Sequence, residues 1–119
     1  MSIFDNDLNR LNFEDFIWVI FIGLSILNII GDNYQKEFIE TYNSEDENSA
    51  NNIFLFVLWI SLLIYIYFFI RNIKAYEKVS EEEKELFAIK VFGSILFIVG
   101  VICLIYFQYK QTNFIGTPV

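Results

Sequence analysis

Long apolar stretches alternate with polar segments along this chain, and the most uniform apolar stretch covers residues 53–70. That stretch, IFLFVLWISLLIYIYFFI, contains no charge, no Gly and no Pro, and Ser61 is its only small polar residue. At 1.5 Å per residue a helix of this length covers roughly 27 Å, close to the thickness of the bilayer hydrocarbon core. Residues 13–31 and 90–107 are two further apolar stretches. The pattern predicts an all-α membrane protein with three transmembrane helices in a single domain.

The segments around the first span are polar. In residues 1–12 the spacing of Phe4, Leu8 and Leu11 gives one apolar stripe, which predicts a short interfacial helix. Asn12 is a good N-cap for the first span, and Gly31 followed by Asp-Asn is a reasonable stop. Residues 32–52 are then expected to form an acidic outer loop, with a short surface helix followed by the flexible linker NSEDENSANN.

The segment between the second and third spans, residues 71–89, keeps helix-forming character although it is charged. Ser80 followed by Glu83 is the pattern of a capping box, so a new helix should begin there, well before the third span. The second and third helices are therefore predicted to form a long hairpin that extends into the cytoplasm, and residues 108–119 a short outer tail.

The charge distribution predicts an orientation. The net charge is −7, and Lys and Arg carry the signal in the positive-inside rule. One side of the predicted topology holds six of them and the other holds two: Arg10, Arg71, Lys74, Lys78, Lys84 and Lys90 against Lys36 and Lys110. We expect a multi-pass protein of the cell membrane with its N-terminus in the cytoplasm and its C-terminus outside. No basic patch stands clear of acidic neighbours, so a nucleic-acid partner is not expected.

Polar residues within the spans are the first candidate sites. Ser25 and Asn28 share a helical face, and with Ser61 and Tyr65 they could line a polar path through the membrane. We favour the alternative, in which these side chains form hydrogen bonds between helices.

Small and charged residues give two further candidates. Gly93 and Gly100 are seven residues apart on one face of the third span, where they could pack within the chain or against a second copy. Asp15 and Lys90 should lie at equal depth near the inner interface, which predicts an ion pair between them. As an alternative, Lys90 and Arg71 could hold a phosphate or a lipid headgroup.

The sequence contains no motif for chemistry. It has no His, no P-loop, no CxxC and no nucleophile elbow, and no span has a carboxylate at its centre, so no metal or other cofactor is expected. The abundance of Ile, Asn, Phe, Tyr and Lys indicates AT-rich coding and hence a bacterial source.

Three classes of function fit these features. The first is a non-catalytic accessory, regulatory or immunity-type subunit that acts through helix and loop contacts with a membrane-protein partner in the lipid bilayer. The second is a small channel or transporter formed by self-association, because three spans are too few to enclose a path alone. The third is a lipid-modifying enzyme. In size and three-span layout the chain is similar to bacterial diacylglycerol kinase, but that family has carboxylates and Asn on membrane-embedded helices, and residues 53–70 have neither.

Overall fold

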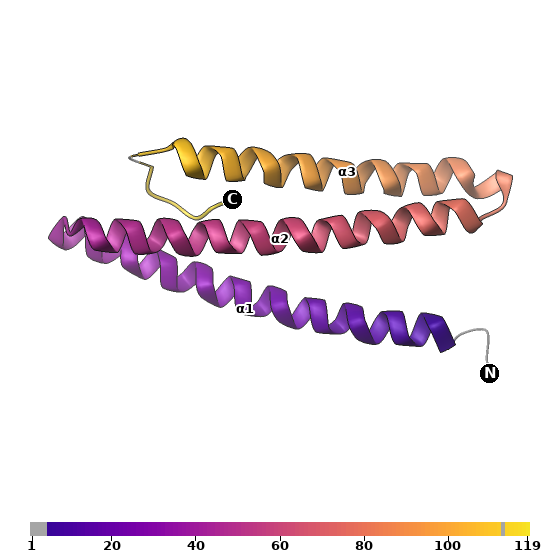
Figure 1. Cartoon of the computed structure of the whole chain (residues 1–119), viewed down its shortest axis with the longest axis horizontal. Coiled ribbons are helices and arrows are strands. Elements are labelled where there is room, and N and C mark those ends of the chain that lie inside the picture. The colour runs from indigo at the N-terminus through magenta and orange to yellow at the C-terminus, as the bar shows by residue number, and fades with distance from the viewer. Residues whose placement is uncertain (1–4, 113) are drawn as a thin grey trace.

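The computed structural model describes residues 5–112 and 114–119, and over this range the chain is all-helical, with no strand. Its helices are α1 (Asp5–Thr41), α2 (Ser44–Lys78) and α3 (Glu81–Lys110) (Figure 1). Each is long and apolar enough to cross a membrane, which fits a multi-pass membrane protein. Phe4, the first residue of the predicted interfacial stripe, lies outside the described range.

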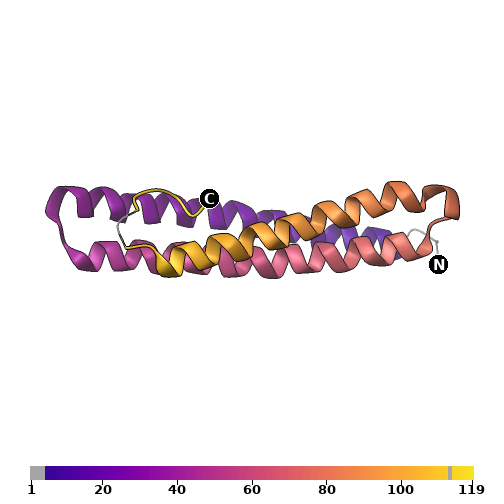
Figure 2. The same ribbon diagram turned by 90° about the horizontal axis from the view of Figure 1, so that it is seen from above.

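The three helices form one twisted layer with α2 in the middle, and α1 passes behind α2 at the end of the molecule that holds the turn between them (Figures 1 and 2). Helices α1 and α3 each pack against α2 but not against each other. The molecule measures 59 × 28 × 14 Å, and its smallest dimension is close to the diameter of one helix. We call the end that holds the α2–α3 turn the hairpin end, and the end that holds the α1–α2 turn the acidic end.

Two apolar seams hold the layer together, one on each side of α2. On α1 the buried positions recur every three or four residues or at multiples of that spacing, and they comprise Glu14, Ile17, Leu24, Gly31 and Gln35. The first seam joins α1 to Val57 and Ile64 of α2. The second joins Leu58 and Leu62 of α2 to Val101 and Ile105 of α3. This spacing keeps one face of each helix toward its neighbour, as in left-handed helix pairs.

The predicted hairpin of the second and third helices is confirmed. Helix α2 continues to Lys78, and α3 begins at Glu81 after Ser80, which is the N-cap residue. The predicted capping box is not formed, because the Ser80 side chain makes no capping hydrogen bond. The backbone N–H of Glu83 instead donates to the Ser80 carbonyl at 3.0 Å.

The predicted flexible linker is wrong, while the short surface helix predicted before it is part of α1. Helix α1 runs through Asn12 and Gly31 to Thr41, and α2 begins at Ser44, so residues 32–52 are helical apart from a two-residue turn. Tyr42 closes α1 with a φ of 56°, and the side chain of Asn43 accepts a hydrogen bond from Glu45 N–H at 3.0 Å. The apolar pattern stops at the limit of the hydrocarbon layer, but the helices continue, since this segment contains no Pro and several good helix formers.

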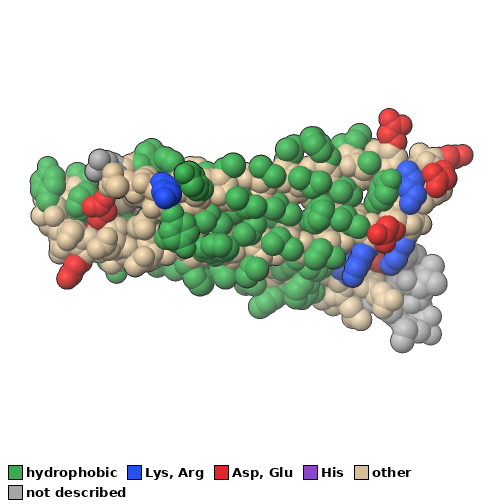
Figure 3. All heavy atoms as spheres, turned by 45° about the horizontal axis from the view of Figure 1, so that its top comes forward, with side chains coloured by type: hydrophobic (Ala, Val, Ile, Leu, Met, Phe, Trp, Pro, Cys, Tyr) green, Lys and Arg blue, Asp and Glu red, His purple; other side chains and the backbone are tan. Residues whose placement is uncertain are grey.

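Side chains are sorted along the length of the molecule (Figure 3). Hydrophobic side chains cover the middle of the face shown, and charged side chains gather toward its two ends. In the most apolar windows of α1, α2 and α3 only 17%, 22% and 17% of the residues are buried within the chain. So much exposed apolar surface requires lipid, or another apolar surface, to cover it.

Gly31 is the position where α1 and α2 approach most closely among the described glycines. A Cβ placed on it would lie 2.9 Å from Cζ of Phe54, a fully buried ring of α2. We predict that Gly31→Ala lowers the free energy of unfolding by about 1–3 kcal/mol relative to the matched Gly23→Ala, where a Cβ meets nothing within 4 Å. SDS-induced unfolding in mixed micelles, followed by circular dichroism, measures this difference. Equal stability of the two variants would contradict the close contact.

Candidate functional site

The most deeply buried charge pair links α1 to α2 near the hairpin end. The Glu14 carboxylate accepts a hydrogen bond from Arg71 Nη1 at 3.0 Å and from the Tyr67 hydroxyl at 3.1 Å. Its side chain is 8% exposed and that of Arg71 is 21% exposed. Arg10, one turn earlier on α1, adds a second positive charge at 3.6 Å from Glu14. A carboxylate is tolerated at such a position because both its charge and its hydrogen bonds are satisfied.

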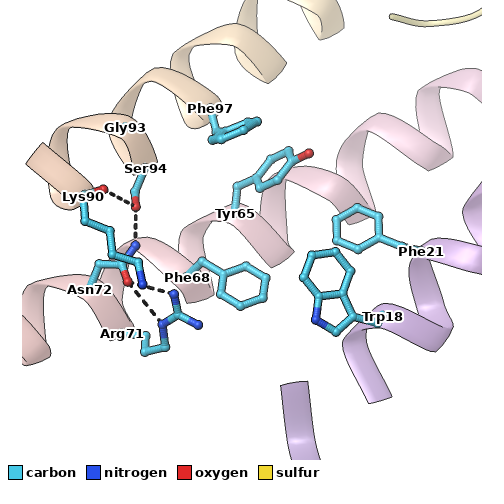
Figure 4. Close-up of a pocket in the computed structure, with 10 residues that line it drawn as sticks. All are labelled: Trp18, Phe21, Tyr65, Phe68, Arg71, Asn72, Lys90, Gly93, Ser94 and Phe97. Atoms are coloured by element: carbon cyan, nitrogen blue, oxygen red, sulfur yellow. Dashed lines mark hydrogen bonds between the residues drawn. The ribbon is translucent and has the colours of Figure 1, made fainter. Parts of the chain in front are cut away.

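This pair is one end of a polar chain, Glu14–Arg71–Asn72–Ser94, that crosses all three helices. The Asn72 side-chain oxygen accepts hydrogen bonds from Arg71 Nε at 3.2 Å and Nη2 at 2.9 Å. Its amide nitrogen donates to the Ser94 hydroxyl on α3, which in turn donates to the Lys90 carbonyl at 3.0 Å (Figure 4). The chain therefore connects α1 to α3 through α2, although α1 and α3 do not contact each other.

The structure places the interhelical ion pair at different residues from those predicted. Among the described residues no ion pair joins Asp15 to Lys90, and the carboxylate that pairs is Glu14, with Arg71. The predicted depth was similar, but one residue corresponds to a rotation of about 100° around the helix axis. Asp15 therefore lies on the exposed side of α1, while Glu14 lies on the face that packs against α2.

A groove of about 610 Å³ lies beside this polar chain. Its lining comes from all three helices: Trp18 and Phe21 of α1, Tyr65, Phe68, Arg71 and Asn72 of α2, and Lys90, Gly93, Ser94 and Phe97 of α3. Figure 4 shows the aromatic rings grouped together and Arg71, Asn72, Ser94 and Lys90 grouped at the other end. Arg71 and Lys90, the two residues predicted as an alternative anion site, thus line one groove.

The four polar residues predicted within the spans also line a common cavity, a smaller one of about 170 Å³. These are Ser25, Asn28, Ser61 and Tyr65. They do not bond to one another. Ser25 donates to the Phe21 carbonyl on its own helix at 3.0 Å, and the buried Asn28 side-chain oxygen has no partner among the described residues. The cavity does not contain the predicted interhelical hydrogen bonds.

The predicted packing of Gly93 and Gly100 within the chain is not observed. A Cβ on either residue would meet nothing within 4 Å. Gly93 faces the groove, and Gly100 lies on the exposed surface of α3. The glycine that allows close helix packing is Gly31. Because Asp-Asn follows it in the sequence, it is predicted to end the first helix, but it lies inside α1.

Sequence reasoning missed two contacts at the acidic end, one between α1 and the tail residues 114–119 and one between α2 and α3. Gly116 N–H donates to the Gln35 side chain of α1 at 3.0 Å, and Gln108 of α3 donates to Asn51 of α2 at 2.7 Å. Figure 2 shows the last residues running back between α1 and α3. Gln35 continues the buried spacing of α1, so the heptad-like pattern could have identified it.

No family model matches the chain, and no curated protein and no solved structure matches it either. Within the part of the chain that the structure describes, no group of three or more His, Cys, Asp or Glu side chains could hold a metal ion. What the arrangement offers is a neutralised polar chain that holds the helices together and, beside it, an apolar groove with two cationic side chains.

The Glu14–Arg71 pair can be tested with a double-mutant cycle. We predict that Glu14→Gln and Arg71→Gln each lower the free energy of unfolding by about 3 kcal/mol, because the first leaves Arg71 without its carboxylate and the second leaves the buried Glu14 with only the longer contact to Arg10. The double variant should lose less than the sum, with a coupling free energy of about 1–3 kcal/mol.

The matched control for this cycle is Asp15→Asn combined with Lys90→Gln. These two changes should be additive within about 0.5 kcal/mol, because the residues form no ion pair with each other. SDS-induced unfolding of the purified variants measures both cycles. A large coupling for Asp15 with Lys90, and none for Glu14 with Arg71, would reverse the assignment.

Proposed function

We propose that this protein is a small non-catalytic membrane subunit, of an accessory, regulatory or immunity type, that acts by binding a membrane-protein partner through the outward faces of its helices. The observation that carries the proposal is the single-layer architecture. Because α1 and α3 occupy opposite sides of α2, neither covers the other, and each presents a continuous apolar face to its surroundings. A layer that is one helix thick has the shape of a component that packs against a larger body.

The exposed face of α3 is the best candidate for this contact. It carries large apolar side chains about a turn apart, with the small residue Gly100 among them: Phe92, Leu96, Val99 and Tyr106. A small residue lets a neighbouring helix approach closely, and among the described residues nothing lies within 4 Å of a Cβ at Gly100, which leaves that position available. Charged helix ends that extend beyond the apolar zone offer additional polar contacts on either side of the membrane.

A homo-oligomeric channel or transporter is the second candidate function. The observation that favours it is the Asn28 side-chain oxygen, which is buried in a cavity with Ser25, Ser61 and Tyr65 but has no partner among the described residues. An unpaired polar atom at this depth is costly unless water or another chain reaches it. Closed symmetry around that face would supply the remaining walls of a path.

Site-specific photo-crosslinking in native membranes distinguishes these functions. With p-benzoylphenylalanine at Val99 of α3, or at Ile22 on the exposed face of α1, we expect an adduct of one constant mass with a different membrane protein. A variant with the photo-crosslinker at Leu86, which is exposed on the polar part of α3, is the control for random collision. Gly100→Leu should lower the Val99 adduct several-fold, and Gly23→Leu on α1 should not.

The other outcomes of the crosslinking experiment argue against the accessory subunit. A ladder of the chain with itself would replace that proposal with the homo-oligomer. Adducts with lipid alone, at all three positions, would contradict both.

We propose further that the hairpin end lies in the cytoplasm of a bacterial cell. It gathers six of the eight Lys and Arg residues, and the acidic end holds Lys36 and Lys110. In a Cys103→Ala background, which removes the single Cys, a membrane-impermeant maleimide added to intact cells should label Ser44→Cys and leave Ser80→Cys unlabelled until the membrane is opened. Both serines are exposed, so the pair is matched. The reverse labelling would invert the orientation.

A further inference from the structure

The groove beside the polar chain has the features of an amphiphile site. Its volume of about 610 Å³ is within the range of sites that bind small organic ligands. It lies between α1 and α3, which do not contact each other, so its floor is α2 and its side is open to the surrounding lipid. A molecule already in the bilayer can therefore enter it laterally, without passing through water.

The walls of the groove are aromatic over most of their length. Neighbouring rings contact one another across the three helices, with centroids 5.0 Å apart for Tyr65 and Phe97, 6.1 Å for Phe21 and Tyr65, and 5.4 Å for Trp18 and Phe21. Phe68 extends the series, at 6.1 Å from Trp18. This surface can contact hydrocarbon but presents no charge to it.

Two cations, Arg71 and Lys90, lie at the polar end of the groove, and only Arg71 is paired with a carboxylate. The Arg71 guanidinium lies over the Phe68 ring at 4.8 Å and uses three of its five N–H donors on Glu14 and Asn72, which fixes its position and leaves two donors for a ligand. Lys90 forms no ion pair with any described residue, and its contact in the polar chain is made by its backbone carbonyl. The Lys90 ammonium is therefore a charge without a counter-charge within the described chain, at the mouth of an apolar groove.

We propose that this groove binds an anionic phospholipid, with the phosphate at Lys90 and the edge of Arg71 and an acyl chain along the aromatic rings. The charge decides between occupants. An apolar partner helix would cover the rings but bring no anion to Lys90, whereas a lipid phosphate supplies that anion and brings hydrocarbon with it. The depth also matches, because Lys90 lies at the junction of the charged and apolar parts of α3.

Trp18 lines the groove, so its fluorescence can report the occupant. The chain has two Trp residues, and Trp59→Phe leaves Trp18 as the only one. The full-length variant is reconstituted into phosphatidylcholine vesicles with a rising fraction of phosphatidylglycerol that carries brominated chains, which quench Trp on contact. Brominated phosphatidylcholine at the same fractions measures quenching by ordinary surrounding lipid. We expect half-maximal quenching at a fraction about fivefold lower for the anionic lipid, the preference that one Lys near an anionic headgroup supplies.

Two variants in this background remove the preference by different routes. Lys90→Gln removes the charge, and Gly93→Leu fills the groove without a clash, because a Cβ at Gly93 meets nothing within 4 Å. Their matched controls on the same helix are Lys110→Gln and Gly100→Leu, which lie outside the groove. Both test variants should lose most of the fivefold preference, and both controls should keep it. Unchanged quenching by brominated phosphatidylcholine and unchanged helicity show that each variant is folded.

The remaining outcomes overturn the proposal. Equal quenching by the two brominated lipids would show that the groove does not select an anion. A preference that survives Lys90→Gln and Gly93→Leu would place the anion elsewhere. Millimolar inorganic phosphate at fixed ionic strength should not reverse the quenching, because it lacks the chain that contacts the rings. Reversal would make free phosphate, and not a lipid, the ligand.

Discussion

The structure depends on the pairing of one carboxylate with one guanidinium between α1 and α2. Glu14 is on the face of α1 that packs against α2, and a negative charge there is unfavourable unless a cation and hydrogen-bond donors reach it. Arg71 provides both at 3.0 Å. Because one helical turn is about 5.4 Å, a shift of α1 by one turn would separate the two charges. The pair therefore sets the register in which Gly31 meets Phe54 further along the same seam.

Adjacent residues of α2 extend this constraint to the third helix. Arg71 and Asn72 differ by about 100° in direction, so one side chain faces α1 and the next faces α3, while the hydrogen bonds between them keep both side chains fixed. The central helix thus holds its two neighbours on opposite sides. The same geometry keeps α1 and α3 apart and leaves the aromatic groove between them.

Much of the fold could be predicted from the sequence, because the apolar stretches and the pattern at Ser80 depend on local residues alone. The helical state of residues 44–52 could not, since this polar, acidic stretch has no clear apolar pattern, and only its helix formers and its lack of Pro favoured a helix. At the candidate site, the depth of Arg71 and Lys90 followed from the sequence. Choosing Glu14 over Asp15 required knowing which face of α1 turns toward α2. The spacing of Ile17, Leu24 and Gly31 gives that face, but the charge and the depth of the two acidic residues do not.

Gly93 and Gly100 show how one sequence signal can have two structural meanings. Both lie on one face of α3, and neither packs within the chain, so spacing alone does not separate them. Their surroundings separate them. Gly93 opens onto a groove that ends at Arg71 and Lys90, and the positive charge there favours an anionic amphiphile. Gly100 lies among exposed apolar side chains, a surface whose shape favours another helix. A lipid in the groove would leave the exposed face of α3 uncovered. The lipid site and the partner surface are therefore compatible, because each uses a different part of the same helix.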